Sequence, residues 1–254
     1  MKAISFKLSG KTACFRKPDV NQFAYFTYNN IHKPALLGLL GAIVGLGGYT
    51  QLHDKNRGLK EGKLGYDDGY PEFYEKLQTL KVSITPLAPN GYFSKKIQTF
   101  NNSVGYASQE MGGNLIVREQ WLENPAWQIM ILDDESGEYQ KIAEYLENKK
   151  AVYIPYLGKN DHFANIDEVK VLELESGIED IKISSLFDEK TLQISKIAPK
   201  SELSFYFKEF SPFNLQKKYH FYDEYKQLIF TNHKINEGDY SFVFSNDGKN
   251  YAFI

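Results

Sequence analysis

Basic and aromatic residues that could hold a polyanion gather in three segments of this sequence. The first segment, "GKTACFRKP" (10–18), supplies Lys11, Arg16 and Lys17, and Tyr28 follows it. Lysine and arginine bind phosphates, and aromatic rings stack on unpaired bases. These residue types indicate contact with a single-stranded nucleic acid. Taken alone, such a run is usually just a solvated loop.

The second segment is a polar insertion at 89–113, which is too long for a tight turn. It carries Lys95 and Lys96 among the aromatic residues Tyr92, Phe93, Phe100 and Tyr106. Long loops in compact domains are usually functional or disordered. We therefore expect either a basic arm that wedges into single-stranded RNA or a flexible loop with a few anchored rings.

The third segment is the apolar, glycine-rich stretch at 32–49, "HKPALLGLLGAIVGLGGY". Pro34 suits the first turn of a helix and Gly47-Gly48 suits its end. The free N–H groups at the start of such a helix attract phosphate, and Lys33 stands beside them. We expect Lys33 to bind phosphate, although a solvated lysine is the simpler reading.

Glycines recur along one face of this expected helix, and a glycine stripe lowers helix stability. Gly41 and Gly45 are expected to allow close packing, whereas Gly38, near the helix start, is expected to allow close approach of RNA or a partner. The apolar stretch is shorter than the ~20 residues that a bilayer needs, so we expect no membrane contact.

Evidence for catalysis is weak in this sequence. The five histidines never occur at metal-ligand spacing, and no phosphate-binding glycine motif or nucleophile motif is present. We expect no metal, no cofactor and no enzymatic activity. A metal-free ribonuclease that uses histidine, tyrosine and lysine from distant positions remains an alternative.

Composition and charge place the chain among globular proteins with a polarised surface. It has 254 residues and one cysteine, Cys14, which we expect to be a small buried residue. Residues 1–60 carry a net charge of +7 and residues 61–254 a net charge of −9. With no charged-then-apolar leader at residues 1–10, a cytoplasmic protein is expected.

Hydrophobic patterns give a coarse order of strands and helices. The order from residue 2 to 158 is strand, helix, strand, strand, helix, strand, which is the split βαβ order. We therefore expect an α+β fold: a ferredoxin-like, RRM-like domain at 1–166 and a β-rich annex at 167–254. The expected elements are a half-buried strand at 2–8, the glycine-rich helix, a polar excursion at 51–70, a short helix at 71–80, a strand at 81–87, a hairpin from 114–122 and 126–132, a helix at 136–150 and a strand at 151–158.

Four blocks within residues 1–166 resemble the Cas-five family of CRISPR-associated RAMP proteins, most closely its type I-B branch. The blocks are "SFKLSGKTACFRKP", "KPALLGLLGAIVGL", "VREQWLENPAWQIMIL" and "IPYLGKNDHFANI". The resemblance implies a RAMP fold with a β-hairpin thumb at about 89–113. It also implies a Cascade subunit that binds and caps the 5′ handle of the CRISPR RNA.

By resemblance, Lys33 matches the basic residue before the family's glycine-leucine helix, and Lys11, Arg16 and Lys17 lie beside the handle. Arg118 opens the strand that leaves the thumb. The implied partners are the handle, a Cas-seven-type backbone subunit and the large Cascade subunit, with target DNA near the complex. The resemblance implies a bridge between those two subunits in antiviral defence.

Two other functions remain open at this stage. In the type I-C branch this subunit itself cuts precursor RNA, so a metal-independent endoribonuclease for CRISPR repeat RNA is one alternative. No equivalent His–Lys arrangement is found here, because His32-Lys33 belongs to the helix-start block. The other alternative is a structural bridging protein whose basic residues are incidental.

Overall fold

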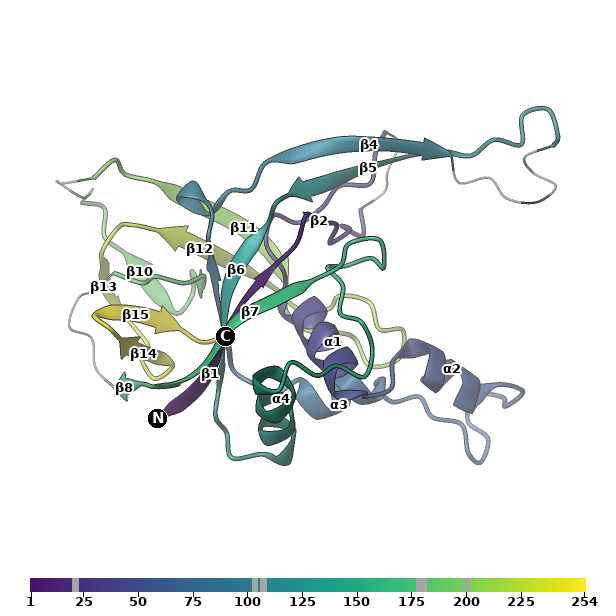
Figure 1. Ribbon diagram of the computed structural model, residues 1–254, viewed down its shortest axis with the longest axis horizontal. Helices are drawn as coiled ribbons and strands as arrows, with labels where there is room; N and C mark the ends of the chain where they lie inside the picture. Colours follow the sequence, from purple (N-terminus) through teal and green to yellow (C-terminus); the bar gives the residue numbers. More distant parts are fainter. Residues whose placement is uncertain (20–22, 102–104, 106–108, 177–181, 198, 200–201) are drawn as a thin grey trace.

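The computed structural model describes residues 1–19, 23–101, 105, 109–176, 182–197, 199 and 202–254. It is a mixed α/β structure whose sheets are antiparallel and whose helices are few (Figure 1). The expected α+β class agrees with this content. Tyr106, one of the aromatic residues of the expected basic arm, lies outside the described residues.

A four-stranded antiparallel sheet forms the centre of the molecule. Its strands are β1 (Lys2–Ser9), β3 (Val82–Pro86), β6 (Ala126–Leu132) and β7 (Asn165–Glu173), in the order β3-β6-β1-β7. Helices α1 (Lys33–Val44), α3 (Glu72–Leu77) and α4 (Gly137–Glu147) lie together on one side of it (Figure 1). Their apolar residues pack on Ile4, Phe6 and Leu8, the alternate residues of β1.

The C-terminal strands cover the opposite face of this sheet. Ala3 of β1 and Met130 of β6 pack there against Phe244 and Phe253. The expectation that β1 is half-buried is therefore wrong: Ala3, Ile4, Ser5 and Phe6 are all fully buried, because apolar layers enclose both faces.

The remaining strands form small antiparallel sheets. Leu186, Leu215, Leu228 and Ile254 join the same core as the helices, so residues 167–254 are not packed as an independent body. The strands are β8 (Glu175–Ser176), β9 (Phe187–Asp188), β10 (Leu192–Ile194), β11 (Tyr206–Pro212), β12 (Tyr225–Thr231), β13 (Ile235–Gly238), β14 (Val243–Asn246) and β15 (Lys249–Ala252); their sheets are β10-β13, β11-β12-β9 and β15-β14-β8.

A second sheet, β2-β5-β4, projects from the body as an arm (Figure 1). It contains β2 (Thr12–Ala13), β4 (Lys95–Asn101) and β5 (Ile116–Glu123), and a short 3₁₀ turn (Pro89–Gly91) precedes it. The strands at 114–122 and 126–132 are confirmed, but their pairing as a hairpin is wrong. The chain bends at Asn124, whose φ is 46°, so that β5 pairs with β4 while β6 pairs in the central sheet.

Helix α1 begins as expected but ends earlier. Pro34 lies in its first turn, and Gly45 terminates it in the left-handed conformation with φ 80°. Gly48 instead caps α2 (Tyr49–Asn56), a helix that the polar sequence at 51–70 did not reveal. Helix α4 agrees with its prediction, since the Ser136 hydroxyl accepts from Tyr139 N at 3.1 Å.

The strand expected at 151–158 is wrong. That segment is irregular, apart from a single bridge between Tyr156 and Phe163, and its backbone bonds to α1 through Val152 N and Ile43 O. The fourth strand of the central sheet is β7, so the expected division after residue 166 falls inside a strand. A run of apolar residues does not by itself reveal which segment pairs with the edge strand of a sheet.

In the residues that the structure describes, no single helix is long and apolar enough to cross a bilayer. Helices α1 and α2 reach the length and composition only as a pair, and they are bent by 77° at their junction.

Candidate RNA-binding surface

The register of the arm sorts the predicted residues onto two faces. Thr99 lies opposite Arg118, so Lys95, Thr99 and Arg118 share one face, which we call the Lys95 face. Lys96 lies opposite Trp121 on the other face, where it also approaches Glu123 at 3.9 Å. Lys95 and Lys96 therefore cannot hold the same stretch of a ligand.

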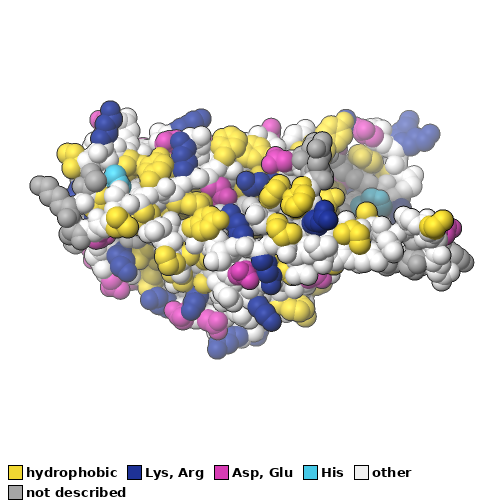
Figure 2. All heavy atoms as spheres, turned by 90° about the horizontal axis from the view of Figure 1, so that it is seen from above, with side chains coloured by type: hydrophobic (Ala, Val, Ile, Leu, Met, Phe, Trp, Pro, Cys, Tyr) yellow, Lys and Arg dark blue, Asp and Glu magenta, His cyan; other side chains and the backbone are white. Residues whose placement is uncertain are grey.

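Three cations of this region, the exposed Arg16 and Arg118 and the half-buried Lys95, each lie near an aromatic ring. The Arg16 guanidinium is 3.3 Å from the centroid of Tyr25, and the Arg118 guanidinium is 5.3 Å from that of Phe23. Lys95 Nζ lies 4.8 Å from the centroid of Tyr92. Cation–aromatic contacts hold these charges in place without neutralising them. Figure 2 shows the result: basic side chains stand among hydrophobic ones on the side that carries the arm.

Lys17 and Lys95 both lie within electrostatic range of the Glu209 carboxylate on β11, and of each other. Burial is the largest effect on Glu209 and raises the pKa of that carboxyl group, whereas the two lysines lower it. The two carboxylate oxygens accept Asn29 N at 2.7 Å and Asn30 N at 3.1 Å. The structure thus brings Lys17 and Lys95 together from two distant segments.

Tyr28 is buried beneath Lys17, whose Nζ lies 5.2 Å from the ring centroid. Burial raises the pKa of the Tyr28 phenol, and the Tyr225 side chain adds to the shift. Tyr28 is therefore a support for Lys17 rather than an exposed stacking ring. Lys11 is exposed at the turn between β1 and β2, where its carbonyl accepts Asn124 N at 2.9 Å.

Lys33 lies apart from the other predicted residues. It is 4% exposed, and its Nζ donates to the carbonyl of Ile254 at 3.3 Å and lies 4.8 Å from the Phe213 ring centroid. Burial, together with Lys81 and Lys226, lowers the pKa of Lys33 to about 8. Of the four cations expected to bind phosphate near the start of the chain, Lys11 and Arg16 are exposed, Lys17 is half-buried, and Lys33 is a core residue.

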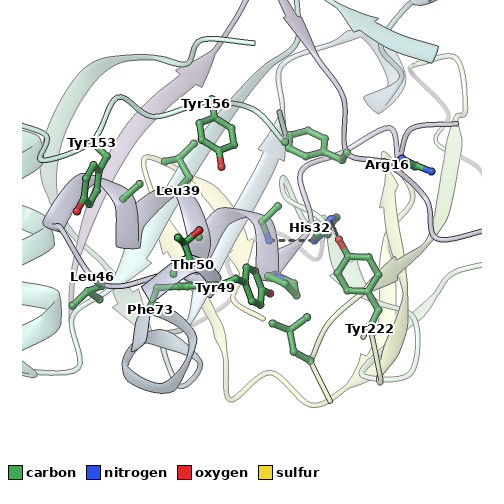
Figure 3. Close-up of a pocket in the computed structure, with 18 of the residues that line it drawn as sticks. Arg16, His32, Leu39, Leu46, Tyr49, Thr50, Phe73, Tyr153, Tyr156 and Tyr222 are labelled. Atoms are coloured by element: carbon green, nitrogen blue, oxygen red, sulfur yellow. Dashed lines mark hydrogen bonds between the residues drawn. The ribbon is translucent and has the colours of Figure 1, made fainter. Parts of the chain in front are cut away.

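A cavity of about 610 Å³ opens along α1, from Pro34 to Leu46, and reaches the start of α2 (Figure 3). Gly38 forms part of its wall, where a Cβ would meet Phe73 at 3.7 Å, an ordinary contact, so close packing does not require a glycine there. Gly41 differs, because its Cβ would come within 2.5 Å of Phe73 Cβ and close packing of α1 on α3 requires the glycine. The remaining wall is aromatic at Tyr49, Tyr153, Tyr156 and Tyr222, and Arg16 is its single charged residue among those described.

His32 closes one end of this cavity and caps α1. Its Nδ1 accepts from Ala35 N at 3.2 Å, and the Tyr222 hydroxyl lies 3.2 Å from Nε2. Burial lowers the pKa of His32 to about 3, so the imidazole is neutral at physiological pH. Both ring nitrogens are occupied by structural partners.

Sequence reasoning missed Lys159 and Glu119; Glu119 lies on the face of the arm that carries Lys96. Glu119 is buried and accepts from Lys159 Nζ at 2.7 and 2.9 Å and from Trp121 Nε1 at 2.9 Å. The only available signal was their presence in two of the four blocks. Cys14 is buried as expected, and burial raises the pKa of its thiol to about 12.

In the described part of the chain, no three His, Cys, Asp or Glu side chains are grouped so that they could hold a metal ion.

No protein-family model matches this sequence, and no curated protein matches it. Solved structures do resemble it. A chain of a "CRISPR RNA-guided surveillance complex" matches with a TM-score of 0.51 and 10% identity, over 92% of this chain and 90% of that chain.

Two further structures match with lower scores. A CRISPR protein from Archaeoglobus fulgidus has a TM-score of 0.49 and 10% identity, over 99% of this chain and 98% of that chain. A chain of the Type III-B Cmr-beta complex bound to cognate target RNA and AMPPnP has a TM-score of 0.47 and 10% identity, over 92% and 86%. At such identity a likeness shows the fold alone: this chain shares its fold with a chain of a CRISPR RNA-guided surveillance complex.

Proposed function

We propose that this protein is a non-catalytic, RNA-binding subunit of a CRISPR ribonucleoprotein complex, a type I-B-like member of the Cas-five family. In this role it caps the 5′ handle of the CRISPR RNA and bridges the Cas-seven-type backbone subunit to the large subunit. The shared fold supports the proposal, as do the four sequence blocks. The complex would act in the cytoplasm, close to target DNA.

The order of elements supports a ferredoxin-like RAMP domain. Strand, helix, strand, strand, helix, strand follow one another as β1, α1, β3, β6, α4 and β7, and the sheet order is β3-β6-β1-β7. By the resemblance, the thumb is expected at about 89–113, a range that includes β4, and we take the β4–β5 arm to be this thumb. We assign to this arm the role of bending the RNA where the handle meets the spacer.

One observation carries the proposal: Lys95 and Arg118 share one face of the arm, Lys17 lies within electrostatic range of Lys95, and each of these three cations lies near an aromatic ring. Ordered cations beside exposed rings suit a single strand, in which phosphates and unstacked bases alternate. Arg16 stands at the edge of the cavity over Gly38, which has room for a nucleotide of the handle (Figure 3).

Binding without cleavage is favoured by the state of His32. General acid–base catalysis needs a side chain that can reach the reacting proton and titrate near the working pH. His32 is buried, neutral and bonded at both ring nitrogens. We therefore propose that another component of the complex generates the CRISPR RNA.

The proposal is tested by purifying the tagged chain with its associated subunits and sequencing the small RNAs that accompany it. We expect RNAs that share one 5′ leader derived from the repeat. The variant Lys17→Glu/Lys95→Glu should lose this RNA, whereas the exposed control Lys149→Glu should retain it. Absence of a common leader in the wild-type sample would contradict the proposal.

A cleavage assay separates binding from catalysis. Purified protein is incubated with repeat RNA in EDTA, and the products are resolved by length. We expect intact RNA. Specific cleavage that is lost on replacing a single histidine would establish the endoribonuclease instead.

A further inference from the structure

The C-terminal strands carry a pair of stacked aromatic rings, of which one is exposed to solvent and the other is half-buried. Phe210 on β11 and Tyr225 on β12 stack with centroids 5.0 Å apart and planes 6° from parallel. Phe210 is nevertheless 57% exposed. Scattered exposed aromatics are ordinary in proteins, but a parallel pair presents a flat apolar surface of the kind on which a base stacks.

This pair is continuous with the cations described above. The Tyr225 side chain lies near enough to Tyr28 to help raise the pKa of its phenol, and Lys17 lies over the Tyr28 ring. Glu209 does not provide the link to Phe210, because consecutive residues of β11 point to opposite faces. Lys95 lies within electrostatic range of Lys17 instead. Positive charge therefore approaches the aromatic pair from the Tyr225 end, through Tyr28 and Lys17.

Two contacts fix the position of the pair relative to these lysines. The Glu209 carboxylate holds Asn29 N and Asn30 N, which ties β11 to the segment that follows Lys17. Phe230 of β12 packs so tightly under Gly91 that a Cβ there would lie 2.6 Å from its ring. Strands β11 and β12 are thus held against both cation-bearing segments before any ligand binds.

We infer that Phe210 and Tyr225 form a stacking platform for an unpaired base of single-stranded RNA, while Lys17 and Lys95 contact the neighbouring phosphates. The inference rests on the proposed function and extends the RNA path onto residues 206–225, for which the sequence offered no role. The adjoining cations favour a polyanion over an apolar protein segment as the occupant.

The test is equilibrium binding of a fluorescein-labelled, unstructured single-stranded RNA of about 12 nucleotides to the full chain, followed by anisotropy. Because stacking on one ring contributes a large share of the affinity per base, Phe210→Ala should weaken binding roughly 5- to 100-fold. Phe210→Trp should retain binding, since a planar ring is kept. The slope of affinity against salt should stay unchanged in Phe210→Ala, because no phosphate contact is removed.

A second exposed pair supplies the control. Phe221, 70% exposed, stacks on Tyr219 with centroids 5.9 Å apart, and the nearby Lys218 is ion-paired with Glu61 at 2.7 Å. Phe221→Ala should bind the RNA as the wild type does. Thermal melting of each variant checks that these exposed substitutions leave the fold intact.

Several results would overturn the platform. RNA affinity unchanged in Phe210→Ala, while Lys17→Glu/Lys95→Glu still loses binding, would reject the platform and leave the proposed function standing. The platform would also be rejected if Phe210→Ala lost binding to a protein partner but kept its RNA affinity. It would likewise be rejected if Phe210→Trp bound RNA as poorly as Phe210→Ala. Failure of the wild type to bind RNA at all would reject both.

Discussion

Two lysines of this protein make the same contact in different surroundings. Lys33 and Lys95 each lie 4.8 Å from an aromatic centroid, Phe213 in one case and Tyr92 in the other. Lys33 is enclosed at the start of α1, whereas Lys95 is half-buried on a projecting arm. The comparison teaches that residue type and a ring partner do not define a ligand site; accessibility decides whether the charge can meet a phosphate.

The largest expected effect is on RNA affinity. Lys17→Glu/Lys95→Glu removes two cations from one path, and at about 1–1.5 kcal/mol for each charged contact the affinity should fall roughly 30- to 100-fold. Lys33→Met should change it less than about twofold, since the buried group meets no phosphate. Fluorescence anisotropy at fixed ionic strength measures both. A larger loss of RNA affinity in Lys33→Met than in the double variant would mean that Lys33, and not Lys17 and Lys95, contacts the RNA.

The next effect concerns stability and pH. Burial lowers the pKa of Lys33 from 10.5 to about 8, so between these values the unfolded chain binds more protons than the folded one. Wild-type stability should therefore rise with pH across that window, relative to Lys33→Met, by on the order of 2 kcal/mol.

Urea unfolding at pH 7 and pH 10.5 measures this difference, and Lys33→Met should be the more stable protein at pH 7. Lys149→Met, at an exposed position, serves as the control and should follow the wild type. If the free energy of unfolding changed with pH equally in the wild type and in Lys33→Met, the pKa of Lys33 would be unshifted, and Lys33 would be solvated rather than buried.

A smaller effect separates two glycines of α1. Gly41→Ala forces a methyl group against Phe73, 2.5 Å from its Cβ, and should destabilise the protein by about 1–3 kcal/mol. Gly38→Ala meets only ordinary contacts and should be neutral or stabilising by up to about 1 kcal/mol. Thermal denaturation compares them. Equal losses of stability in the two variants would mean that Gly38, like Gly41, is tightly packed against Phe73.

Local features of the fold could be predicted where sequence and packing agree. Pro34 marked the start of α1 and Ser136 capped α4, because both act within one helical turn. The fourth sheet strand could not be found, since 151–158 and 165–173 are both apolar enough and only long-range pairing chooses between them. For the same reason the bend at Asn124, which sends β5 and β6 into different sheets, was missed.

The candidate surface was predicted by residue type but not by arrangement. Lys17 and Lys95 were both named, yet their proximity to each other and to Glu209 joins segments far apart in the sequence, which residue type alone does not reveal. Lys95 and Lys96 were treated as equivalent, although strand alternation separates them. Phe210 and Tyr225 carried no signal, because their stacking follows from the pairing of β11 with β12.

The central claim, that RNA lies across Lys17 and Lys95 and not at Lys33, is tested most directly by lysine acetylation with and without bound RNA, read by mass spectrometry. Lys149 and Lys190, both exposed, provide the reference. We predict that RNA protects Lys17 and Lys95, while Lys33 reacts poorly in both states. Protection of Lys33 alone, with Lys17 and Lys95 as reactive as the reference residues, would contradict the account.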